Sequence, residues 1–134
     1  MEILLYQLKD IENIKKFIEI CKELNIKLSL IARKTDIDYH KLSKDINIYY
    51  SFDEYLDKNK DKRFLFFETY GNKYVWDINL KDFDIFVFGA EDYGIPLNEI
   101  EKVKNKEIVK IPTKVYGSYN VVSSFVIFLS FYFK

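Results

Sequence analysis

The chain is built from short hydrophobic runs separated by polar segments. Six runs of four to six residues are bounded by charged or turn-forming residues, a pattern typical of strands buried on both faces of a sheet. They comprise residues 3–6, 27–32, 47–50, 64–67, 85–88 and 108–111. Because these runs alternate with helical segments, the pattern predicts an α/β fold with a mostly parallel sheet and helices on both faces.

Helical periodicity separates several of these runs. Between Ile11 and Leu24, apolar residues recur every three or four positions, and Asp10 stands where an N-cap is expected. Ser51, followed three residues later by Glu54, matches a capping box. The pattern therefore predicts helices that begin after these two caps, and further helices at residues 97–103, 121–133 and briefly within 35–45.

The segment from Val121 to Phe133 is apolar nearly all round. Such a helix has to be covered on more than one side, so we expect a homodimer that buries part of it. The segment is too short for the ~20 residues that span a bilayer. The first residues of the chain lack the pattern of a secretory signal, and we expect a cytoplasmic protein that does not contact a membrane.

Composition narrows the classes of partner. With 134 residues, the chain is predicted to form a single domain over residues 1–134. It carries 21 basic and 21 acidic residues, so any RNA binding has to come from a local patch rather than from net charge. One cysteine excludes an intrachain disulfide, and one cysteine with one histidine cannot form a closed zinc shell, so no metal is expected.

Two glycine-containing turns follow the last two predicted strands. Gly89 and Gly94 lie in the first turn, where Gly94 is expected to be needed for the turn itself, and Gly117 lies in the second. In open α/β sheets, ligands bind outside the carboxyl ends of the strands. The two turns together therefore predict one binding site. A Rossmann-type nucleotide site is not indicated, since no Gly-x-Gly-x-x-Gly follows the first strand.

The sequence of these turns resembles that of a known family. Residues 87–96, reading VFGAEDYGIP, resemble the second motif of the SpoU (TrmH-type) branch of the SPOUT RNA methyltransferases. Ile111-Pro112 followed by residues 117–123, reading GSYNVVS, resembles the third motif of that branch. The two motifs occur in the family's order and at a spacing similar to the family's.

The resemblance implies a C-terminal deep trefoil knot over about residues 67–134, a homodimer, and S-adenosyl-L-methionine as cofactor. It implies methyl transfer to RNA, most simply to a ribose 2′-hydroxyl of tRNA or rRNA. By position in the motifs, the residues expected to bind the cofactor are Phe67, Glu68, Thr69, Gly89, Ala90, Glu91, Ile111, Ser118 and Asn120. Those expected to take part in catalysis are Asn13, Glu91, Ser118 and Asn120. Three of these have simpler interpretations: Glu91 facing solvent, Ser118 capping the last helix, and Asn120 satisfying a loop carbonyl.

The first motif of the family is only partly present. Residues 13–19, reading NIKKFIE, match its Asn and Ile, but Glu19 stands where an arginine that accepts the hydroxyl proton is expected. Lys15, which replaces a glycine of the motif, Lys16 or Arg33 could substitute for that arginine. The alternatives are an RNA base as acceptor, another acceptor, or a catalytically inactive SPOUT-fold protein that binds RNA or protein.

Overall fold

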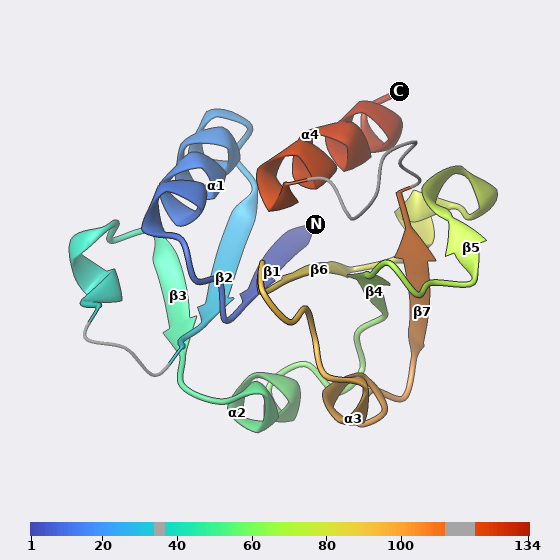
Figure 1. The fold of residues 1–134 in the computed structure, drawn as a ribbon, viewed down its shortest axis with the longest axis horizontal. Coiled ribbons are helices and arrows are strands. Elements are labelled where there is room, and N and C mark those ends of the chain that lie inside the picture. The colour runs from blue at the N-terminus through green and yellow to red at the C-terminus, as the bar shows by residue number, and fades with distance from the viewer. Residues whose placement is uncertain (34–36, 112–119) are drawn as a thin grey trace.

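A parallel sheet forms the centre of the structure, a computed structural model that describes residues 1–33, 37–111 and 120–134 (Figure 1). Within those ranges the sheet has seven strands in the order β3-β2-β1-β6-β4-β7-β5, and neighbouring strands pair in parallel. The strands are β1 (Glu2–Tyr6), β2 (Lys27–Ile31), β3 (Ile46–Tyr49), β4 (Phe64–Phe67), β5 (Lys73–Tyr74), β6 (Ile85–Gly89) and β7 (Lys106–Lys110). Their carboxyl ends therefore share one edge, and the predicted parallel sheet is confirmed.

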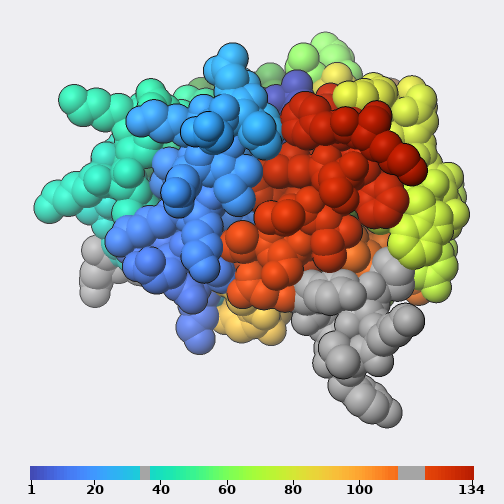
Figure 2. All heavy atoms as spheres, turned by 90° about the horizontal axis from the view of Figure 1, so that it is seen from above, coloured from blue at the N-terminus to red at the C-terminus, as the bar shows by residue number. Residues whose placement is uncertain are grey.

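Helices cover both faces of the sheet, as predicted (Figure 1). Helices α1 (Ile11–Glu23) and α4 (Val121–Tyr132) lie side by side on one face (Figure 2), and α2 (Phe52–Asp57) and α3 (Leu97–Ile100) lie on the other. Three short 3₁₀ turns complete the described elements: η1 (Tyr39–Lys41), η2 (Val75–Asp77) and η3 (Leu80–Asp82). No helix in the described ranges has the length and apolar character needed to cross a bilayer.

Local sequence determines where the first two helices begin. The Asp10 carboxylate accepts a hydrogen bond from the Glu12 amide at 2.9 Å, which satisfies one of the free N–H groups of the first turn of α1. The Ser51 hydroxyl accepts from the Glu54 amide at 3.1 Å at the start of α2. In a regular capping box, the Glu54 side chain would accept a hydrogen bond from the amide of the cap residue, Ser51. Here it accepts from the amide of Tyr50, one residue earlier.

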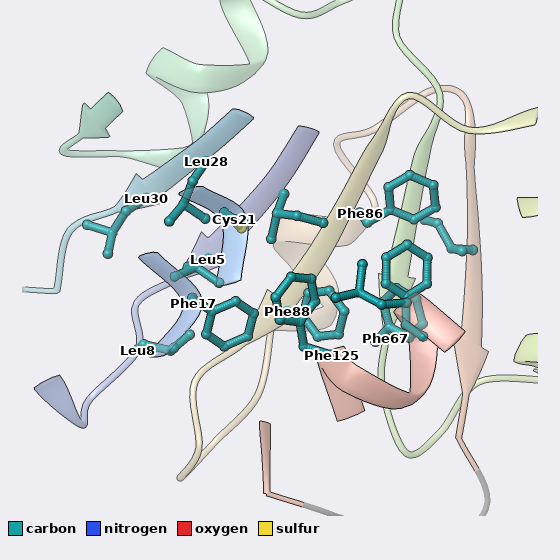
Figure 3. Close-up of a cluster of buried hydrophobic side chains, with 14 of the residues drawn as sticks. Leu5, Leu8, Phe17, Cys21, Leu28, Leu30, Phe67, Phe86, Phe88 and Phe125 are labelled. Atoms are coloured by element: carbon teal, nitrogen blue, oxygen red, sulfur yellow. The ribbon is translucent and has the colours of Figure 1, made fainter. Parts of the chain in front are cut away.

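Aromatic rings fill the larger core, between the sheet and helices α1 and α4 (Figure 3). Phe17 of α1 stacks on Phe125 of α4 with ring centroids 4.5 Å apart, and Phe67 of β4 stacks on Phe88 of β6 at 4.5 Å. Each fully buried side chain of this size contributes roughly 1.5–3 kcal/mol through burial. The core therefore joins strands β4 and β6 to both helices on this face.

The structure adds one strand to the sequence prediction and moves several element boundaries. Strand β5 was not predicted, since both of its residues are exposed and carry no hydrophobic pattern. Strand β7 covers 106–110 rather than 108–111, and helix α3 ends at Ile100 rather than Val103. The connection from 112 to 119 lies outside the described residues, so the trefoil knot stays a prediction.

Candidate functional site

A cavity of about 520 Å³ opens at the carboxyl ends of β4, β6 and β7. This volume falls within the ~300–1,000 Å³ of typical small-molecule sites. Its walls combine apolar side chains, glycine-containing backbone and three carboxylates. The described lining residues are Phe67, Glu68, Thr69, Tyr70, Phe88, Gly89, Ala90, Glu91, Asp92, Tyr93, Gly94, Ile111, Asn120, Val121 and Ser124.

The cavity brings together most of the residues expected to bind the cofactor. Eight line it: Phe67, Glu68, Thr69, Gly89, Ala90, Glu91, Ile111 and Asn120. The ninth, Ser118, lies outside the described residues. These residues come from three loops that are separated by up to 53 positions in the chain, from 67 to 120. Their roles in binding stay predictions, but their convergence on one cavity is a property of the fold.

The Glu91 carboxylate ties the second-motif loop to the start of α1. It accepts hydrogen bonds from the Lys9 amide at 2.7 Å, from the Asp10 amide at 3.0 Å and from the Asn13 side-chain amide at 2.9 Å. Asn13 is only 7% exposed and does not line the cavity. Asn13 therefore contacts the cavity lining through Glu91, and its expected part in catalysis stays a prediction. Although Glu91 is exposed, the interpretation that it only faces solvent is wrong, because three donors hold it.

Glu68 connects the loop after β4 to the second-motif turn. Its Oε1 accepts a hydrogen bond from the Ile95 amide at 2.6 Å, and burial raises the pKa of the carboxyl above its ordinary value. A Cβ on Gly94 would lie 2.6 Å from the same oxygen, and Gly94 has a φ of 68°. The turn therefore requires glycine at this position, as the sequence indicated.

Gly89 and Asn120 have local structural tasks in addition to lining the cavity. A Cβ on Gly89 would lie 2.6 Å from Cγ1 of Ile95, so glycine allows the turn to pack against the end of β6. Asn120 is the N-cap of α4, and its Oδ1 accepts a hydrogen bond from the Val122 amide at 2.8 Å. The described cap of this helix is therefore Asn120, and Ser118, which was expected to cap it, lies outside the described residues.

A second cluster of side chains beside the cavity was missed by the sequence analysis. Arg33 follows β2 and donates to both carboxylate oxygens of Asp92, at 3.1 and 2.6 Å. Its guanidinium also lies over the ring of Tyr93, 5.0 Å from the centroid. The hydrogen bonds from Arg33 lower the pKa of Asp92 to about 2. These three residues all follow carboxyl ends of strands, and those ends share one edge of a parallel sheet. That rule alone would have placed the three side chains near one another.

The partly matching first motif gives the cavity no cation in the described structure. Lys15 pairs with Glu12 at 3.3 Å on the exposed side of α1, and Lys16 and Glu19 are exposed and do not line the cavity. Arg33 is engaged by Asp92. The described lining residues accordingly include carboxylates but no lysine, arginine or histidine. The described ranges also hold no group of three or more His, Cys, Asp or Glu side chains suited to a metal ion.

Comparison with known proteins identifies the family. The sequence pattern of the SpoU rRNA methylase family matches residues 1–130, nearly the whole chain. The chain belongs to the SpoU rRNA methylase family. The resemblance inferred from residues 87–96 and 111–123 is thereby confirmed, and so is the predicted class of enzyme, an RNA methyltransferase.

Solved structures share the fold of this SpoU methylase. A putative RNA methyltransferase from Bacillus anthracis is 28% identical, with a TM-score of 0.79 over 98% of this chain and 91% of that one. A structure described as giving insight into the 2-OH methylation of C/U34 on tRNA is 19% identical, with a TM-score of 0.84 over 98% and 93%. An AdoMet-bound rRNA methyltransferase from Sinorhizobium meliloti is 16% identical, with a TM-score of 0.77 over 96% and 53%. The last two likenesses establish a common fold.

Proposed function

We propose that this SpoU methylase transfers the methyl group of S-adenosyl-L-methionine to a ribose 2′-hydroxyl of tRNA or rRNA. The observation that carries the proposal is the convergence of three loops of the family's motif region on one cavity of ligand size. Family membership supports RNA as substrate. The 2′-hydroxyl as acceptor is supported by the activity for which one structural neighbour is described.

The chemistry of the cavity suits this cofactor. Phe67, Phe88 and Ile111 offer apolar surface against which an adenine can pack. The carboxylates of Glu68 and Glu91 suit a ligand with positive charge and hydroxyl groups, and no basic side chain among the described lining residues opposes them. When bound, S-adenosyl-L-methionine supplies an electrophilic methyl group on a positively charged sulfur.

The contribution of the chain to the reaction is chiefly one of positioning. Methyl transfer needs the attacking oxygen, the methyl carbon and the sulfur in line, so small displacements of the site are costly. Glu91 fixes the second-motif loop to α1 through Asn13, and Glu68 fixes the following turn through Ile95. Asn120 holds the start of α4 at the cavity. The first two contacts tie the second-motif loop to α1 and to the loop after β4, and the third orders the start of α4.

Calorimetry followed by a transfer assay tests the proposal. The wild-type protein is expected to bind S-adenosylmethionine and S-adenosylhomocysteine, and to methylate unmodified cellular RNA at a 2′-oxygen detected by mass spectrometry of nucleosides. Asn120→Ala should reduce both binding and transfer. Asn105→Ala, an exposed position at the opposite end of the sheet, is the matched control.

Each other outcome of this experiment has a defined meaning. Failure to bind either form of the cofactor would refute the enzyme. Methylation of a base rather than a ribose would refute the 2′-hydroxyl as acceptor. Cofactor binding without transfer to any RNA would support the catalytically inactive alternative raised by Glu19.

We also propose that the protein is a homodimer that packs through α4. Val126 of this helix is 50% exposed, and Phe133, its C-cap residue, is 55% exposed. Trp76 of η2 is 53% exposed, and its ring centroid lies 6.1 Å from that of Phe131. An apolar surface of this kind favours a partner. Sedimentation should show a dimer that Val126→Asp converts to a folded monomer; a monomeric wild type would overturn the proposal.

A further inference from the structure

Four residues from three strand ends form a fixed aromatic surface beside the cavity. Gln7 follows β1, Arg33 follows β2, and Asp92 and Tyr93 follow β6. We call this group the Tyr93 platform. Asp92 and Tyr93 also line the cavity, so the platform borders it. Of these four residues, only Arg33 was considered for a role above, as a substitute for the missing first-motif arginine.

The ring of Tyr93 is held at its hydroxyl end and over one face. The hydroxyl donates a short hydrogen bond to the Gln7 side-chain oxygen, and the Arg33 guanidinium lies 5.0 Å from the ring centroid. Arg33 is in turn fixed by two hydrogen bonds to Asp92. Despite these contacts, 50% of Tyr93 is exposed. A ring that is rigidly held yet half exposed is already in place to bind a flat ligand.

Gln7 organises the platform at some cost in backbone energy. Its φ of 50° lies in the left-handed region, which non-glycine residues rarely adopt. In that conformation its amide donates to the Ile31 carbonyl at 3.0 Å, its carbonyl accepts from Arg33 at 3.4 Å, and its side chain reaches Tyr93. Strained residues of this kind cluster at functional sites, where the surrounding contacts hold them in place.

From this arrangement we propose that Tyr93, backed by Arg33, is a stacking surface for an unpaired base of the RNA substrate. Aromatic rings and guanidinium planes are the surfaces on which proteins stack splayed RNA bases. The pairing of Arg33 with Asp92 leaves the platform without net charge, so it holds RNA through a base rather than a phosphate. This suits a chain with 21 basic and 21 acidic residues, which has no general electrostatic attraction for RNA.

The inference rests on the proposed RNA substrate and is tested by direct binding of RNA, without turnover. The probe is a fluorescein-labelled, mixed-sequence single-stranded RNA, and cofactor affinity is measured separately by calorimetry. Tyr93→Ala should raise the Kd for this RNA roughly 5- to 140-fold, which corresponds to ~1–3 kcal/mol per stacked base at ~1.4 kcal/mol per factor of ten. Tyr93→Phe, which keeps the ring, should stay within about twofold of wild type.

Two further measurements separate stacking from other roles of Tyr93. The slope of log Kd against log salt concentration should be the same in Tyr93→Ala as in wild type, because no phosphate contact is lost. Because Tyr93 also lines the cavity, the affinity for S-adenosylhomocysteine should fall by a clearly smaller factor than the affinity for RNA. Tyr50→Ala, an exposed tyrosine beside the outer strand β3, controls for loss of a surface ring and should bind RNA as wild type does.

Defined results would overturn the inference. An unchanged RNA affinity in Tyr93→Ala would exclude stacking, and a parallel loss of cofactor affinity would show that Tyr93 only supports the cavity loop. A reduced salt slope would show that the lost contact was to phosphate. If the wild-type protein binds the RNA probe but neither binds the cofactor nor transfers methyl groups, the proposed enzyme fails while the platform stands.

Discussion

Replacing Glu91 by alanine should destabilise the protein more than an ordinary surface substitution does. The carboxylate accepts three hydrogen bonds that join residues about 80 positions apart, from the amides of Lys9 and Asp10 and from the Asn13 side chain. The two backbone amides are exposed and can bind water when the carboxylate is removed. The Asn13 amide is buried and cannot be rehydrated in the same way.

The expected magnitude follows from these differences. A hydrogen bond to a charged group contributes ~1.5–3 kcal/mol, and a buried donor left unpaired costs ~1–3 kcal/mol. With the two amides largely rehydrated, Glu91→Ala should lower the free energy of unfolding by about 2–4 kcal/mol. Asn13→Ala should cost about 1 kcal/mol less than this, because it removes the buried donor together with its bond. Glu91→Gln should fall between wild type and Glu91→Ala.

Urea denaturation of the wild type, the two alanine variants and their double variant measures the coupling. If Asn13 and Glu91 act through one bond, the double variant should be more stable than the sum of the single losses predicts, by about 1–2 kcal/mol. Thermal unfolding should shift by roughly 3–5 °C per kcal/mol for a chain of this size. Additive losses, or a loss below about 0.5 kcal/mol in Glu91→Ala, would refute the described role of Glu91.

Three further predictions concern single positions. Gly71→Ala should lower the free energy of unfolding by about 1–3 kcal/mol, because the new Cβ would lie 2.6 Å from the backbone carbonyl carbon of Val109; urea denaturation tests this against the exposed control Asn72→Ala, and equal stabilities would contradict it. Burial raises the pKa of the Glu68 carboxyl in the folded protein. The protonated carboxyl therefore contributes its full share to the free energy of unfolding below the ordinary glutamate pKa, and this share is lost as the pH rises through the raised pKa. The difference in unfolding free energy between wild type and Glu68→Gln should therefore decline with rising pH over that window, and parallel pH profiles would show the carboxyl to be unperturbed. Burial also raises the pKa of the Cys21 thiol to about 12, so iodoacetamide at pH 8 should label the native protein far more slowly than the urea-unfolded protein, as measured by mass spectrometry; similar rates would mean that the thiol is accessible.

The sequence was informative wherever local pattern and burial coincide. The hydrophobic runs found six of the seven described strands, because strands buried on both faces need continuous apolar residues. Asp10 and Ser51 were identifiable as caps because capping depends on residues only two or three positions away. The glycine turn after β6 located the cavity, since carboxyl ends of parallel strands meet at one edge; the turn with Gly117 lies outside the described residues.

What the sequence did not reveal depends on contacts between distant residues. Strand β5 has no hydrophobic pattern and is recognisable only from its pairing with β7. The bond from Asn13 to Glu91 and the pairing of Arg33 with Asp92 join residues 78 and 59 positions apart. Periodicity reports which side of an element is buried, and it carries no information on which polar side chains meet across loops.

Helix α4 follows every described strand of the sheet in the chain, which has a consequence for how the protein is made. Its Phe125, Phe128 and Leu129 complete the larger core and contact rings of β4, β6 and α1. Until residues 121–132 have left the ribosome, the part of the aromatic face that α4 covers stays open beside α1, and at ~5–20 residues per second this lasts throughout synthesis of the preceding strands. Nascent chains halted before Val121 should therefore bind chaperones and aggregate, whereas those in which residues 121–132 have emerged can close their core.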